Sequence, residues 1–252
     1  MATGRSVVIN GDLGSGKSTV SVLLAQRLGI RRVSVGDVYR DMAVRRGMSA
    51  LDLNLHAELD DKIDHYVDQL QSDIATSGDV VVVDSRLAWF FFHDALKVHL
   101  VTDPDVAAHR VLARPADATE GYTSVAEARQ RLAERSESER LRFITRYGAD
   151  KTRLRNYDMV CDSTRAMPEE IVTRIVDGLG APAGAGPRLF VDPGRVRIGE
   201  PGPDSPTHPV EVRYVRGDFV LVAGRAALRA AVDRGEPLVV AALAEPVDEP
   251  SG

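Results

Sequence analysis

The sequence has very little cysteine and no long apolar run. Its one cysteine, Cys161, cannot form an internal disulfide, and no closely spaced Cys and His residues indicate a zinc site. There is no stretch of about 18 apolar residues that would span a bilayer. Glycines interrupt the first apolar run at once, unlike the apolar core of a secretory signal. These absences predict a cytoplasmic protein that does not contact a membrane.

A surplus of positive charge is also missing. The chain carries 32 Lys and Arg against 37 Asp and Glu, a net charge of −5, which argues against broad nucleic-acid binding through overall charge. What is present is a globular composition, with 252 residues, 44% hydrophobic and 27% charged. That length allows one large domain or two modest ones, and any anion site must be local.

Short apolar runs alternate with helical patterns through about residue 180. The predicted strands are residues 7–9, 32–35, 80–83, 98–101 and 159–161. Strands that alternate with helices are typical of an α/β protein with a parallel sheet covered on both faces. Ligands of such sheets bind at the carboxyl ends of the strands.

A glycine-rich loop follows the first predicted strand at that end. Its polar and flexible positions are Gly11, Asp12, Gly14, Ser15, Gly16, Lys17, Ser18 and Thr19. Glycines let several backbone N–H groups face one anion, and the following helix adds its positive N-terminal end. Lys17 reaches the terminal phosphates and Ser18 can hold Mg²⁺. The loop predicts a P-loop fold that binds a nucleoside triphosphate, with ATP and Mg²⁺ expected.

Charged residues follow the third predicted strand. Asp84 ends that strand, where its carboxylate can reach Mg²⁺, and the alternative is that it caps the next helix. Arg86 can point a guanidinium fork into the same site for phosphate contact, or form a surface ion pair.

Further arginines have the spacing of a phosphate-binding protein. Arg40 lies one turn into a helix after the second strand and can grip an acceptor phosphate. Arg110 and Arg114 stand four apart, so both face the same way and can stack on a base and touch phosphates.

A long charged helix is predicted over 124–147, after a polar, turn-rich arm at 114–123. It carries a stripe formed by Arg131, Arg135 and Arg142. Such a stripe is either a solvated helix face or part of a lid that closes over the transferred phosphate.

Two sets of residues expected on the acceptor side each allow two interpretations. The aromatic run 89–92 favours buried core over a wall that stacks on a base. Asp64 and Asp68 lie one helical turn apart and either read a pyrimidine edge or form a solvated face.

Small residues, glycine and proline fill 181–187, which predicts a linker between a domain at 1–180 and a smaller α/β domain at 188–247, followed by a tail at 248–252. In the second domain the patterns predict strands at 210–215, 219–222 and 238–243. A helix is predicted from Arg225 to about Val232.

The motifs together resemble the nucleoside monophosphate kinases, most closely the archaeal-type cytidylate kinases, over about residues 5–179. The positions that carry the resemblance are the loop 11–19, residues 34–37 with Arg40, residues 84–88, Arg110 with Arg114, the run 135–140 and residues 157–160. The resemblance implies a three-layer α/β/α fold with a helical lid.

It also implies transfer of the ATP γ-phosphate to CMP or dCMP, with a monomer or homodimer as the working form. Lys17 is then on the donor phosphates with Arg110 beside the nucleotide. Arg114, Arg135 and Arg142 close over the transferred group, and the acceptor site draws on Asp37, Arg40, Asp64, Asp68 and Arg86. Where that family usually shows Glu-Gly-Arg, this chain has residues 84–86 as Asp-Ser-Arg, which leaves the acceptor open. The alternative enzyme is a P-loop kinase for another small or modified pyrimidine.

The C-terminal part, with residues 218–224 leading into residues 228–231, resembles more weakly the ParB/sulfiredoxin-like domain. Gly224 is followed by Arg225-Ala226-Ala227, so most polar positions of that family are lost. The resemblance implies either a docking or oligomerisation piece, or phosphate or DNA contact through Arg225 and Arg229. A different class of function follows from the second option, a nucleotide-gated DNA-binding or scaffolding protein.

Overall fold

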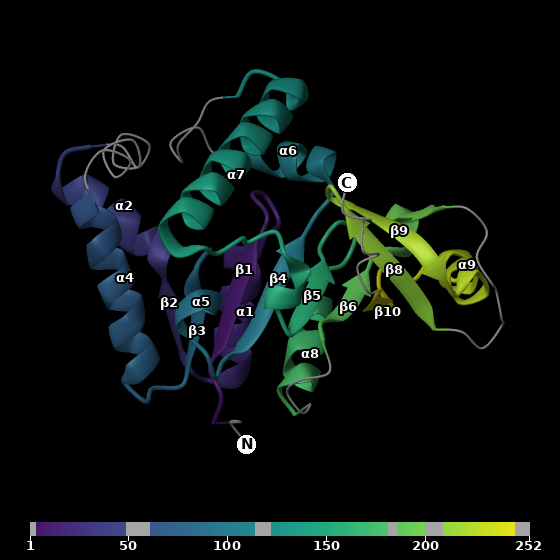
Figure 1. Ribbon diagram of the computed structural model, residues 1–252, viewed down its shortest axis with the longest axis horizontal. Coiled ribbons are helices and arrows are strands. Elements are labelled where there is room, and N and C mark those ends of the chain that lie inside the picture. The colour runs from purple at the N-terminus through teal and green to yellow at the C-terminus, as the bar shows by residue number, and fades with distance from the viewer. Residues whose placement is uncertain (1–3, 49–60, 114–121, 181–185, 200–208, 245–252) are drawn as a thin grey trace, which may run out of the picture.

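A computed structural model describes residues 4–48, 61–113, 122–180, 186–199 and 209–244. Its centre is one sheet of ten strands in the order β2-β3-β1-β4-β5-β6-β10-β8-β9-β7 (Figure 1). The first five strands in this order are parallel to one another. They are β1 (Val7–Gly11), β2 (Arg31–Ser34), β3 (Val81–Asp84), β4 (Leu96–Val101) and β5 (Met159–Asp162). The five strands predicted from the apolar runs are confirmed, with ends shifted by one or two residues.

The helices between these strands are α1 (Lys17–Leu28), α2 (Val35–Arg45), α4 (Asp61–Thr76), α5 (Ala88–Phe91), α6 (Pro104–Leu112), α7 (Val125–Tyr147) and α8 (Pro168–Leu179). A short 3₁₀ turn, Leu154–Asn156, precedes β5. Among the described residues, no helix combines the length and apolar character needed to cross a bilayer.

Successive side chains of the central strands enter two apolar clusters on opposite faces of the sheet. Val7 and Ile9 belong to one cluster and Val8 to the other. Helices α1 and α8 cover the face of Val7, while α5 and the end of α7 pack on the face of Val8. Because both faces are covered, the central strands β1, β3, β4 and β5 are mainly apolar, and the predicted three-layer α/β architecture is confirmed.

The ends of the long helix α7 are set by local sequence. The Ser124 side chain accepts a hydrogen bond from the backbone N–H of Glu127, and Glu127 in turn accepts from Thr123. At the other end Gly148 adopts a left-handed conformation, φ 65°, which ends the helix. The predicted long helix is confirmed, whereas residues 114–121 of the predicted arm lie outside the described residues.

The C-terminal segment, defined as residues 188–244, continues the same sheet (Figure 1). Its elements are β6 (Arg188–Val191), a 3₁₀ turn (Pro193–Arg195), β7 (Val196–Ile198), β8 (Val210–Val215), β9 (Asp218–Ala223), α9 (Arg225–Asp233) and β10 (Val239–Leu243). Strand β6 pairs parallel to β5 and antiparallel to β10. Strands β8, β9 and β10 and helix α9 agree with the sequence patterns, whereas β6 and β7 had no counterpart among the predicted strands.

Strand pairing thus joins the two predicted domains edge to edge. Residues 181–185 of the predicted linker and the tail lie outside the described residues. The division into two domains stays a prediction, because a shared sheet does not say whether residues 188–244 fold independently.

Candidate active site

The loop between β1 and α1 has the backbone of an anion cradle. Gly14 and Gly16 have φ values of 81° and 79°, a region that favours glycine. A Cβ atom on Gly14 would lie 2.8 Å from the Cβ of Ala107 in α6, so the loop packs directly against that helix. Within the loop the Ser15 N–H donates to the Asp12 carbonyl at 3.1 Å.

One polar atom of this loop has no protein partner. The Ser15 hydroxyl is buried and makes no hydrogen bond to any described residue. Buried polar atoms are almost always paired in proteins, so an unpaired one inside a glycine-rich turn indicates room for a hydrogen-bonding ligand. Ser18 and Thr19, by contrast, are exposed at the start of α1.

Asp84 lies at the centre of the charged groups beside this loop. Its carboxylate is 2% exposed and forms ion pairs with Lys17 and with Arg32, the latter at 2.7 Å. The Ser21 hydroxyl donates to the same carboxylate at 3.3 Å. The first residue of α5 is preceded by Leu87 as its N-cap, so the alternative that Asp84 caps this helix is wrong.

The protonation states in this group follow from burial and mutual contact. Burial lowers the pKa of Lys17, while Asp84 acts in the opposite direction, and the nearby Arg86 lowers the pKa further. Burial raises the pKa of Asp84, but Lys17 and Arg32 outweigh it, so the pKa of this carboxyl lies below its ordinary value. The carboxylate is therefore charged at neutral pH and holds two cations next to the loop.

Arg32 extends this network to α2. Its guanidinium donates to Asp84, to the Ser21 hydroxyl at 2.7 Å and to the Asp37 carboxylate at 2.9 Å. Asp37 also pairs with Arg40, which is more than half exposed. Thus Lys17, Asp84, Arg32, Asp37 and Arg40 form one continuous chain of charges that links the loop after β1 to the region predicted to bind the acceptor.

A second cluster of cations surrounds Glu139 on α7. This carboxylate is buried and contacts Arg86, Lys151 at 3.0 Å and Arg135 at 3.4 Å. Three basic side chains thus meet at one carboxylate, and guanidinium and ammonium groups are the donors that suit a phosphate. The alternative that Arg86 forms an ordinary surface pair is wrong, since its partner is buried.

The pKa of Lys151 is shifted strongly in this cluster. Burial, together with Arg86, lowers the pKa of Lys151 to about 7. Asp12 of the loop after β1 acts on the same group in the opposite direction, which places the Glu139 cluster within electrostatic range of that loop. The two groups of charges therefore belong to one region.

Arg110 contacts protein atoms on several sides. Its guanidinium donates to the Ser163 carbonyl at 2.7 Å and lies 3.5 Å from the Gly14 carbonyl. It also contacts the Thr102 and Ser163 hydroxyls. Arg110 thus lies beside the glycine loop and connects it through hydrogen bonds to the residues after β5. That Arg110 stacks on a base stays a prediction.

The remaining predicted residues separate into three groups. The Asp68 carboxylate accepts a hydrogen bond from the Tyr147 hydroxyl at 2.8 Å and lies 3.8 Å from Arg146. On α7, Arg142 lies over the Phe143 ring, Arg135 contacts Glu139 and Arg131 is exposed. The three arginines of the predicted stripe therefore have different surroundings. Arg114 and the side chain of Asp64 lie outside what the structure describes.

The aromatic run 89–92 is mainly core. Trp89 and Phe92 are 8% and 5% exposed, whereas Phe90 is at the surface. The preference for core over a base-stacking wall is confirmed for these two buried rings.

The donor set suits a magnesium ion that arrives with a nucleotide. Within the described ranges no three His, Cys, Asp or Glu side chains gather to hold a metal on their own. Mg²⁺ in phosphoryl-transfer sites keeps most of its water and takes only one or two protein oxygens. The exposed Ser18 hydroxyl and the Asp84 carboxylate supply such oxygens, and Asp84, already paired with two cations, suits contact through water.

Sequence reasoning missed three residues of this region: Arg32, Glu139 and Lys151. Glu139 lay within the run 135–140 that carried the family resemblance, and Arg32 lies in the second strand, which pairs with β3. Both therefore had a local signal. Lys151 follows the end of α7 without any motif, so only the fold identifies it.

Comparison with known proteins gives consistent results. Residues 7–142 match the family AAA_18, described as an AAA domain. A cytidylate kinase from Natronomonas pharaonis is 38% identical over 167 residues, 66% of this chain and 84% of that protein. A cytidylate kinase from Methanobrevibacter smithii is 34% identical over 170 residues, 68% of this chain and 95% of that protein.

A solved structure, shikimate kinase from Bacteroides thetaiotaomicron, has a TM-score of 0.52 at 16% identity. It covers 70% of this chain and 99% of its own. At this identity the likeness concerns the fold alone.

Proposed function

This chain belongs to the cytidylate kinase family, and from that premise we propose that it transfers the γ-phosphate of ATP to CMP or dCMP, giving ADP and the nucleoside diphosphate. The observation that carries the proposal is the continuity of charges from Lys17 through Asp84 and Arg32 to Asp37 and Arg40. It joins a cradle for one phosphate group to cations that suit a second.

On the donor side, the backbone N–H groups of residues 11–19 and the N-terminus of α1 hold the triphosphate. The unpaired Ser15 hydroxyl donates to it, and Lys17 exchanges Asp84 for the β- and γ-phosphates. Ser18 and Asp84 would hold Mg²⁺ here, and the ion would supply positive charge that neutralises the phosphates.

On the acceptor side, Arg40 and Arg86 bind the monophosphate. Because phosphoryl transfer needs mainly positioning and charge stabilisation, these guanidinium groups serve to align an acceptor oxygen with the γ-phosphorus. A bond forms between that oxygen and phosphorus, the bond to the bridging oxygen of ADP breaks, and the electron pair stays on ADP. Arg135 and Arg142 of α7, with Arg114, stabilise the charge on the group in transfer.

The experiment is a coupled ADP-release assay with CMP, dCMP, UMP, dTMP, AMP and GMP, extended to hydroxymethylated pyrimidine nucleotides, nucleosides and DNA. We expect CMP or dCMP to give the highest kcat/KM. A preference for a modified pyrimidine would favour the alternative kinase. ATP binding without phosphorylation of any compound would contradict the assignment of an acceptor site.

Arg86→Ala separates donor from acceptor in the same assay. We expect the KM for the monophosphate to rise about 30-fold, as for loss of one charge-assisted contact of about 2 kcal/mol, while the KM for ATP changes much less. Arg153→Ala, at an exposed arginine of the loop before β5, is the control. Equal increases in both KM values would contradict the role given to Arg86.

For the C-terminal segment, the likeness to the ParB/sulfiredoxin-like domain stays a prediction, as do a cytoplasmic location and a monomer or homodimer. Arg229 on α9 is exposed and so suits a phosphate of DNA. Binding of duplex DNA as a function of salt, with the full chain and with Arg225→Ala/Arg229→Ala, tests it. Negligible DNA binding by both proteins would contradict DNA as a partner of the C-terminal segment.

A further inference from the structure

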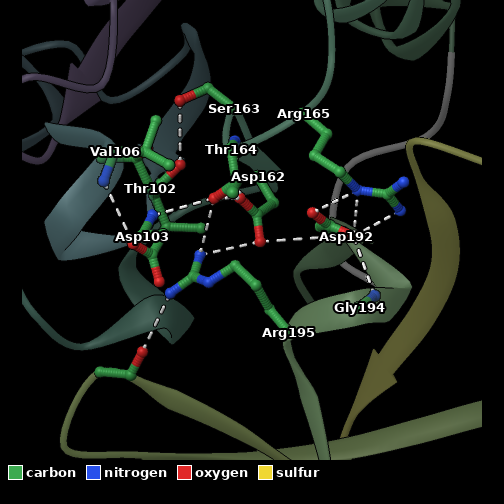
Figure 2. Close-up of polar contacts among 12 residues, drawn as sticks. Thr102, Asp103, Val106, Asp162, Ser163, Thr164, Arg165, Asp192, Gly194 and Arg195 are labelled. Atoms are coloured by element: carbon green, nitrogen blue, oxygen red, sulfur yellow. Dashed lines mark hydrogen bonds and ion pairs between the residues drawn. The ribbon is translucent and has the colours of Figure 1, made fainter. Parts of the chain in front are cut away.

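Two ion pairs cross between the end of β5 and the beginning of the C-terminal segment (Figure 2). Arg195, which ends the 3₁₀ turn after β6, pairs with Asp162 at 2.8 Å. Arg165, just after β5, pairs with Asp192 at 2.7 Å. Each side therefore contributes one aspartate and one arginine, and both carboxylates are almost fully buried.

Asp162 depends on this crossing contact. Burial raises the pKa of its carboxyl, and Arg195 is the largest influence in the opposite direction. The other carboxylate oxygen accepts from the Thr164 N–H at 3.0 Å and from its hydroxyl at 2.6 Å. A buried carboxylate without its cation is costly, so Arg195 from the C-terminal segment stabilises the conformation of residues 162–165.

Residues 162–165 are in turn tied to the glycine loop. The Ser163 carbonyl accepts from Arg110, and the same guanidinium lies 3.5 Å from the Gly14 carbonyl. Thr164 also accepts from the Asp103 N–H at the start of α6, the helix against which Gly14 packs. A continuous path of contacts therefore leads from Arg195 to the phosphate cradle.

The acceptor candidates lie on the other side of β1. The sheet order places β3, which leads to Arg86, and β2, which leads to Asp37 and Arg40 on α2, on one side of β1, and β4 and β5 on the opposite side. A change at Asp162 thus reaches the donor side of the site first.

We propose that Arg195 is a positioning residue for the donor nucleotide: the C-terminal segment holds residues 162–165, and through Arg110 the glycine loop, in the geometry that binds ATP. This inference rests on the proposed function in taking ATP as the ligand of the loop. It gives the C-terminal segment a role in the kinase reaction without any partner of its own.

The test compares two arginine variants of the same segment by calorimetric titration with ATP and with CMP. Arg195→Gln removes the buried crossing pair. Arg197→Gln, the matched control, removes a pair with Asp218 in which the arginine is 70% exposed. We expect Arg195→Gln to weaken ATP binding about 10-fold, the size of a typical coupling between sites. CMP binding should change less than about twofold, and Arg197→Gln should leave both unchanged.

Failure of this inference is distinct from failure of the proposed function. Wild-type protein that does not bind ATP would overturn the proposed function. Wild-type protein that binds ATP, with equal affinity in Arg195→Gln and Arg197→Gln, would overturn the inference alone, as would an equal loss of ATP and CMP binding.

A second variant keeps the test decisive if Arg195→Gln does not fold by circular dichroism. Asp162→Asn combined with Arg195→Gln leaves no buried charge unpaired. The same weakening of ATP over CMP binding is expected from this double variant, and wild-type ATP affinity in it would contradict the role of Arg195. Arg195→Lys, which keeps the charge, should restore most of the affinity.

Discussion

The parallel half of the sheet and the C-terminal half differ in how deeply their ion pairs are buried. In the parallel half, Asp84 and Glu139 are buried and each holds two or more cations. In the C-terminal half, buried pairs occur only where residues 192–195 meet the end of β5 in the described structure, and the pairs Arg197–Asp218 and Arg234–Glu236 lie at the surface. Because burying charge is costly unless it is paired, a buried carboxylate that meets several cations beside the glycine loop is a candidate for an anion-binding site.

The largest expected effect tests the donor side of the charged half. Lys17→Ala should reduce kcat by about 1000-fold, because the terminal phosphates lose their cation and Asp84 loses one partner. The measurement is steady-state ADP release at saturating ATP and acceptor. Arg27→Ala, an exposed arginine in the last turn of the same helix, is the control. A loss of less than about 10-fold would contradict the assignment of Lys17.

The next effect concerns the stability of the cation cluster. Glu139→Gln should lower the free energy of unfolding by about 3 kcal/mol, because Arg86 and Lys151 lose their buried counter-ion. Urea denaturation measures it, with Glu137→Gln as the control. Glu137 sits on the same helix and pairs with Arg140 at the surface, so its replacement should leave the unfolding midpoint unchanged. Equal shifts in both variants would remove the distinction between buried and exposed charge.

The smallest effect is a pH dependence from Lys151. With its pKa lowered to about 7, Lys151 in the free protein is mostly neutral above that pH. A bound phosphate favours the protonated form, so binding above pH 7 takes up a proton and affinity falls as the pH rises.

We therefore expect CMP affinity to fall by about fivefold between pH 7 and 9, where the phosphate itself stays ionised. Lys151→Arg, which keeps its charge over this range, should give a flat profile. A flat profile for the wild type, measured by titration calorimetry, would mean that Lys151 does not face the bound phosphate.

The sequence-based predictions of strands and helices were more complete for the parallel half of the sheet than for the C-terminal half. The strands β1, β3, β4 and β5 were predictable because they are mainly apolar in a sheet covered on both faces, and α7 because Ser124 and Gly148 mark its ends. The glycine loop was predictable because its backbone requirements are local. Strands β6 and β7 were missed, since they are short and owe their conformation to pairing with β5, β10 and β9.

The sequence by itself determined the glycine loop, the parallel strands, the long helix and the residue types available for phosphate binding, because these depend on neighbours a few positions apart. Only the tertiary structure decided which charges meet. Arg32 joins Asp84 to Asp37, Lys151 joins Arg86 at Glu139, and Arg195 reaches Asp162. The pairs Arg32–Asp84, Arg86–Glu139 and Arg195–Asp162 join residues far apart in sequence. Strand order and burial choose such partners, and the energy of an ion pair depends on both.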